Sequence, residues 1–141
     1  MSDALKLSYK IDGDNFSSAG EASANVKKKL RQLGLDTEII RRVAIAMYEG
    51  EINMVIHANG GTAEVVVSSE RVEILLSDTG PGIADVELAM KEGYSTAPED
   101  VHALGFGAGM GLPNMKKYTD EMKIESTVGV GTKVYMAVNI I

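Results

Sequence analysis

The chain has 141 residues, of which 45% are hydrophobic and 24% charged, and its formal net charge is −6. This size predicts one domain spanning residues 1–141, and the composition argues against disorder. The acidic balance argues against direct nucleic-acid binding, no apolar run reaches the roughly 20 residues of a membrane span, and the lack of Cys excludes a thiol nucleophile. Because the first residues lack a basic segment followed by an apolar one, we expect no export signal and a cytoplasmic location.

The first sixty residues predict a strand followed by two helices. Residues 5–11 alternate apolar and polar side chains, which is the pattern of a half-buried strand. Residues 18–33 repeat apolar side chains at helical spacing, and the basic side chains within 27–31 fit a solvated helix face better than a partner surface. A longer helix is expected at 37–57, stopped by the Asn-Gly-Gly at 59–61.

The rest of the chain predicts two hairpins with short helices between them. Strands rich in Val, Ile and Leu are expected at 63–67 and 71–76, with a turn at 78–82. The later elements are expected to be a short helix at 85–92, a mobile segment at 93–110, a helix at 113–119 and strands at 122–127 and 133–140. Strands and helices without regular βαβ alternation predict a two-layer α/β sandwich with a mixed, mainly antiparallel sheet.

A polar stripe on the longer helix is the first candidate for chemistry. Glu49, Asn53 and His57 are each four residues apart, so on a helix they lie along one face. A carboxylate can accept a proton, and an amide oxygen can ligate a hard cation such as Mg²⁺. Such a spacing also occurs as ordinary surface polarity. Glu51 lies on another face and is expected to be a solvated charge.

Asp78 is the second candidate, at the end of a predicted strand. Asp before Thr-Gly often caps a turn through its own side chain. A carboxylate at this position could also accept a hydrogen bond from an exocyclic amine such as that of adenine, with Gly80 and Gly82 allowing the backbone to approach closely. The residues alone leave both interpretations open.

A glycine-rich run is the third candidate. Gly105, Gly107, Gly109 and Gly111 occupy alternate positions directly before the helix predicted to begin at Pro113. Such a backbone can turn successive amides toward an anion, although it can also serve as a flexible hinge. The run has neither the spacing of a P-loop nor that of a dinucleotide-binding G-x-G-x-x-G.

Together these motifs resemble those of the GHKL ATPases, the superfamily that includes gyrase, histidine kinases and MutL. The matching segments, in chain order, are Glu49-x-x-x-Asn53 (the N box), Asp78-x-Gly80-x-Gly82-Ile83 (the first glycine box), Gly107-x-Gly109-x-Gly111-Leu112 (the second glycine box) and Gly131-Thr132. The order of four motifs is far more specific than any one of them. The resemblance implies an α/β sandwich that holds ATP between helices and sheet.

The resemblance also implies a role for each matching residue. Glu49 would orient or deprotonate the attacking hydroxyl, and Asn53 would ligate Mg²⁺. Asp78 would bind the adenine amine, Thr132 would support the base through its hydroxyl, and His57 would line the pocket. At Gly80, Gly82 and Ile83 the backbone would run close to the adenine base. The phosphates would be wrapped by the segment containing Gly105, Gly107, Gly109, Met110, Gly111 and Leu112.

The length is similar to that of the free-standing bacterial branch of this superfamily, the anti-sigma serine kinases and the related switch kinases. That similarity implies a serine/threonine kinase that uses ATP and Mg²⁺ and phosphorylates a small antagonist protein. A sigma factor or another regulator, and a second copy of the chain, are the further partners that it implies. No Lys or Arg occurs between Lys91 and Lys116, where the anti-sigma branch typically keeps a basic residue. The alternative is an ATP-dependent binding module that sequesters a sigma factor or another regulator and hydrolyses little.

Overall fold

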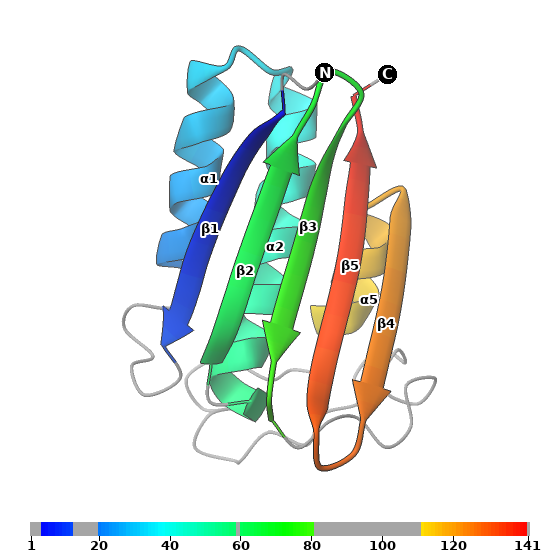
Figure 1. The fold of residues 1–141 in the computed structure, drawn as a ribbon. Helices are drawn as coiled ribbons and strands as arrows, with labels where there is room; N and C mark the ends of the chain where they lie inside the picture. The colour runs from blue at the N-terminus through cyan, green and yellow to red at the C-terminus, as the bar shows by residue number, and fades with distance from the viewer. Residues whose placement is uncertain (1–3, 13–19, 59, 81–110, 141) are drawn as a thin grey trace.

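The computed structural model describes residues 4–12, 20–58, 60–80 and 111–140, and it shows one sheet with its helices on a single face (Figure 1). In chain order the elements are β1 (Leu5–Asp12), α1 (Glu21–Gln32), α2 (Thr37–Ala58), β2 (Gly60–Val67), β3 (Arg71–Asp78), α5 (Gly111–Lys117), β4 (Glu121–Thr127) and β5 (Gly131–Asn139). The five strands lie in the order β1-β2-β3-β5-β4, and each neighbouring pair is antiparallel. The predicted two-layer α/β sandwich is therefore confirmed.

The element boundaries differ from the predicted ones by a few residues. α1 starts later than expected because Gly20, with a φ of 98°, directly precedes its first turn. β2 starts earlier because Gly60 pairs with Asp12 of β1, so strand pairing holds the glycines that were expected to end the preceding helix. The helix predicted at 85–92 and the segment expected to be mobile at 93–110 lie outside the described residues.

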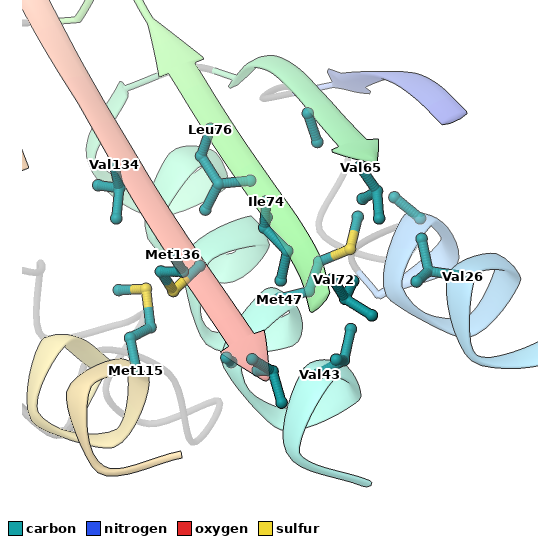
Figure 2. Close-up of a cluster of buried hydrophobic side chains, with 14 of the residues drawn as sticks. Val26, Val43, Met47, Val65, Val72, Ile74, Leu76, Met115, Val134 and Met136 are labelled. Atoms are coloured by element: carbon teal, nitrogen blue, oxygen red, sulfur yellow. The ribbon is translucent and has the colours of Figure 1, made fainter. Parts of the chain in front are cut away.

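The core lies between the sheet and the helices, as Figure 2 shows. β3 illustrates how the sequence builds it: Val72, Ile74 and Leu76 face the helices and are almost fully buried, while the residues between them are only partly buried. Met47 of α2 and Met115 of α5 pack into the same cluster. Burying a side chain of this size contributes about 1.5 to 3 kcal/mol. The apolar face of the sheet therefore helps to hold α1, α2 and α5 in place.

α2 crosses the sheet and contacts β1, β2, β3 and β5. Its C-terminal end lies at the edge of the fold where β3 ends and β5 begins (Figure 1). No helix within the described ranges is long and apolar enough to cross a membrane.

Candidate nucleotide site

Asp78 ends β3, and backbone groups from two segments fix its carboxylate. Its Oδ1 accepts the backbone N–H of Gly80 at 2.9 Å and that of Thr132 at 3.2 Å. The first bond caps the turn that follows β3. The second joins β3 to the neighbouring strand β5, because Thr132 lies opposite Asp78 in their pairing. Among the residues that the structure describes, none donates a hydrogen bond to Oδ2. Asp78 thus caps the turn and keeps one oxygen available as an acceptor.

The first residues of β5 lie beside Asp78 at the same end of the sheet. Thr132 is 9% exposed, and its Oγ1 lies 2.8 Å from the Oγ of Ser126 on β4. Ser126 also donates to the carbonyl oxygen of Gly131 at 3.4 Å. Three adjacent strands therefore contribute Asp78, Thr132 and Ser126 to one end of the sheet.

Glu49 lies on α2 and is half-buried. Its Oε2 accepts a hydrogen bond from Nδ2 of Asn114, on α5, at 3.0 Å. One turn further along α2, Asn53 is also half-buried. His57 belongs to the last turn of α2, and its side chain lies outside what the structure describes. The helix thus brings Glu49 and Asn53 to one face, as the four-residue spacing predicts.

Gly50 lets α2 pack closely on the sheet beside this face. A Cβ atom on Gly50 would lie 2.1 Å from Cδ1 of Leu76 on β3 and 3.3 Å from the sulfur of Met115. Leu76 precedes Asp78 by two residues, and Gly50 follows Glu49 directly. α2 and β3 therefore pack closely beside the two candidate carboxylates, Glu49 and Asp78.

Glu51 is not a solvated charge, and this prediction was wrong. The residue is 3% exposed. Its Oε2 accepts the backbone N–H groups of Gly20 at 2.8 Å and Ala22 at 3.2 Å, and its Oε1 accepts that of Ser23 at 3.0 Å. These are among the amides that the first turn of a helix leaves without intrahelical partners, and a carboxylate also interacts favourably with the helix dipole there.

The glycine boxes are only partly described. Gly80 lies in the Asp78 turn, Gly111 is the first residue of α5, and Leu112 is 9% exposed in the core beside α2. The other predicted residues of these boxes, Gly82, Ile83, Gly105, Gly107, Gly109 and Met110, lie outside the described residues.

Sequence reasoning missed two polar residues of this region, Asn114 and Ser126. The hairpin could have revealed Ser126: with Thr127 paired to Gly131 across the turn, Ser126 must pair with Thr132. Nothing comparable reveals Asn114, because 65 residues separate it from Glu49. Only the packing of α5 on α2 brings them together.

The arrangement combines three chemical capabilities at one end of the sheet. Oδ2 of Asp78, to which no described residue donates, can accept a hydrogen bond from an amine. The Glu49 carboxylate can accept a proton, and the amide oxygen of Asn53 can ligate a hard cation. Within the described ranges, no group of three or more His, Cys, Asp or Glu side chains could hold a metal ion.

Two kinds of comparison place this geometry among known proteins. Residues 16–138 match the family described as histidine kinase-like ATPase domain. The chain is 31% identical over 120 residues to the serine/threonine-protein kinase RsbT of Bacillus subtilis, covering 82% of each chain. It is 34% identical over 137 residues to an anti-sigma F factor of Caldanaerobacter subterraneus, covering 94% of this chain and 89% of that one.

Solved structures agree on the fold. The crystal structure of the RsbU and RsbW domains of a Mycobacterium tuberculosis protein superposes with a TM-score of 0.64 at 16% identity, covering 95% of this chain and 32% of that one. The mycobacterial sensor histidine kinase MprB superposes with a TM-score of 0.54 at 15% identity, covering 96% and 97%. At these identities the structures support the fold alone.

Proposed function

We propose, from the premise that the chain belongs to the histidine kinase-like ATPase family, that it is a cytoplasmic protein-serine/threonine kinase of a bacterial partner-switching system. Its acceptor would be a serine or threonine of a small antagonist protein. The similarity to RsbT, which is named a serine/threonine-protein kinase, supports this reading. A sigma factor and a second copy of the chain are the other partners we propose.

The observation that carries the proposal is that Glu49 and Asp78 lie on α2 and β3, two elements in direct contact. Gly50 packs on Leu76, two residues before Asp78, so a proton acceptor and an amine acceptor lie on elements that are packed against each other. A kinase needs this arrangement, because rate depends on holding the nucleophile in line with the phosphate of a bound nucleotide. A simple turn cap at Asp78 would not require a carboxylate on α2.

The described residues fit ATP with Mg²⁺. Oδ2 of Asp78 would accept from the adenine amine, the Thr132 hydroxyl would support the base, and the Asn53 amide oxygen would ligate the metal. Mg²⁺, when bound, neutralises phosphate charge that develops during transfer. This contribution matters here because no Lys or Arg lies between Lys91 and Lys116.

In the proposed reaction, the acceptor hydroxyl oxygen bonds to the γ-phosphorus as the bond from that phosphorus to the β–γ bridging oxygen breaks. Oε1 of Glu49 receives the hydroxyl proton, and ADP is the leaving group. Oε2 is already engaged by Asn114, so the two oxygens of Glu49 have different tasks.

The test is single-turnover transfer from ATP labelled at the γ-phosphate to small antagonist proteins encoded in the same genome. Glu49→Gln should keep ATP affinity and slow transfer by about a hundredfold or more, because a general base acts only in the transition state. Glu38→Gln is a matched control, since Glu38 is an exposed residue of the same helix. Unchanged transfer by Glu49→Gln would contradict the proposal.

The second candidate is an ATP-dependent binding module that sequesters a sigma factor. The similarity to proteins named anti-sigma F factor favours it. If the chain is a module of this kind, the Glu49→Gln variant and the unaltered chain would both capture the sigma factor in the presence of ATP. Neither would form a phosphoprotein.

A further inference from the structure

The contact between Asn114 and Glu49 joins two elements whose sequences give no sign of it. Asn114 lies in α5, three residues after Gly111, and Glu49 lies in α2. The distance from Nδ2 to Oε2 is 3.0 Å, and both side chains are half-buried. The amide must present its nitrogen here, because its oxygen would face a carboxylate oxygen and two acceptors cannot form a hydrogen bond.

The next residue on each helix holds this contact in register. Gly50 follows Glu49, Met115 follows Asn114, and the Met115 sulfur lies 3.3 Å from where a Cβ on Gly50 would stand. Met115 is 1% exposed. Its carbonyl also accepts the Thr119 hydroxyl at 2.8 Å, which ties down the end of α5. The Asn114 amide therefore approaches Glu49 from a helix whose next residue is buried in the core.

A carboxylate with one oxygen anchored has fewer orientations than a free one. Among the described residues only Asn114 donates to Glu49, through Oε2, which leaves Oε1 for a proton-donating hydroxyl and lets α5 set its direction. A charged acceptor also strengthens the hydrogen bond that orients it. The same helix begins at Gly111, where the glycine-rich run of the sequence ends.

We propose that Asn114 is a positioning residue that orients the Glu49 carboxylate for phosphoryl transfer and couples that orientation to the placement of α5. This inference rests on the proposed role of Glu49. It separates the tasks of two residues: Glu49 receives the proton, and Asn114 determines where the receiving oxygen points. The competing explanation is a hydrogen bond that only stabilises the packing of α5.

A double-mutant cycle distinguishes these two explanations. Asn114→Leu removes the donor at nearly constant size, and Asn114→Asp places a second carboxylate against Glu49. Each change is made in the unaltered chain and together with Glu49→Gln. ATP affinity, single-turnover transfer to the acceptor protein, single-turnover ATP hydrolysis and the urea midpoint are then measured for all variants.

If Asn114 acts through Glu49, Asn114→Leu lowers the single-turnover rates about tenfold while ATP affinity stays within about twofold. Asn114→Asp lowers them at least as much. In the Glu49→Gln background both effects shrink to about twofold or less, because interacting residues are not additive. Should Asn114→Asp fail to fold, Asn114→Leu still completes the cycle.

Three results would overturn the inference. Equal losses of rate in both backgrounds would mean that Asn114 acts independently of Glu49. Transfer at the unaltered rate by both Asn114 variants, alongside slow transfer by Glu49→Gln, would remove the role of Asn114 and leave the proposed function standing. Unchanged rates for Glu49→Gln itself would remove both.

Discussion

A Cβ atom on Gly131 would lie 2.2 Å from the backbone carbonyl oxygen of Asp78. The first residue of β5 therefore lies against the turn that follows β3, and any larger side chain would force the two strands apart at the candidate site. The φ of Gly131 is 147°, a backbone conformation that residues other than glycine rarely adopt. Glycine is thus required at position 131 because the backbone of β5 closely approaches the backbone of the turn after β3.

Gly131→Ala should consequently destabilise the domain by about 2 to 4 kcal/mol, from steric overlap and backbone strain together. It should also weaken ATP binding, since Thr132 would move relative to Asp78. Gly129→Ala is the control: its φ is also positive, at 81°, but nothing lies within 4 Å of the added atom. That change should cost only about 1 kcal/mol and leave ATP binding intact. Urea unfolding and nucleotide titration of both variants would check this.

Asp78→Asn tests which of the two tasks of Asp78 matters for binding. An Asn Oδ1 can keep both backbone hydrogen bonds now made by Oδ1, from Gly80 and Thr132, so the turn should remain folded. Nδ2 would then stand in place of Oδ2 and present a donor to the adenine amine. ATP affinity should fall about ten- to a hundredfold.

The control for Asp78→Asn is a nucleotide with a 6-oxo base. Inosine triphosphate (ITP) carries an oxygen acceptor where ATP carries the adenine amine. The ratio of ATP affinity to ITP affinity should therefore fall in this variant, because the new Nδ2 can donate to that oxygen. An unchanged ATP affinity, with an unchanged urea midpoint, would show that Asp78 only caps the turn.

The sequence predicted those features that depend on local periodicity. The alternation in β3 and the helical spacing in α2 placed both elements, and the four-residue spacing placed Glu49 and Asn53 on one face of α2. Asp78 at the end of its strand was also predicted, because its partner Gly80 is a near neighbour in the chain.

Features that depend on tertiary packing could not be predicted in this way. The periodicity of α2 places Glu51 on a different face from Glu49, but it cannot reveal that α1 covers this face and turns its first amides toward it. Asn114 is a comparable case, since its partner lies on another helix. A buried carboxylate and a half-buried amide look like surface residues until the elements that cover them are placed.

Acid should weaken a contact far from the candidate site. The backbone N–H of Asn139, assisted by the guanidinium of Arg42, holds the pKa of the Asp120 carboxyl below its usual value of 3.8. The N–H lies 2.7 Å from Oδ2, and the guanidinium 3.2 Å from Oδ1. Because the folded state lowers this pKa, the stability it contributes is present above pH 3.8 and is lost as the pH falls through the lower, folded value.

Asp120→Asn should therefore cost about 1 kcal/mol near pH 7, a modest amount because the pair is partly exposed. The difference in unfolding free energy between the two proteins should shrink as the pH falls from 4 to 2. Glu125→Gln, at an exposed position of β4, should show no such convergence. Urea titrations at several pH values provide the measurement, and a difference that stays constant down to pH 2 would contradict the assignment.

Glu51→Gln should be the most destabilising of these carboxylate changes. Both oxygens of Glu51 now accept backbone N–H groups at the start of α1, and the residue is 3% exposed. A Gln side chain has one acceptor oxygen, so its amide group would face at least one buried N–H, donor against donor, and the favourable charge at the helix N-terminus would be lost. We expect a loss of about 2 to 4 kcal/mol in urea unfolding, together with faster hydrogen exchange at the amides of Ala22 and Ser23. Glu38→Gln, at an exposed position of α2, should change stability by no more than about 0.5 kcal/mol. If the two variants unfolded at the same urea concentration, the carboxylate of Glu51 would not be what holds α1 to α2.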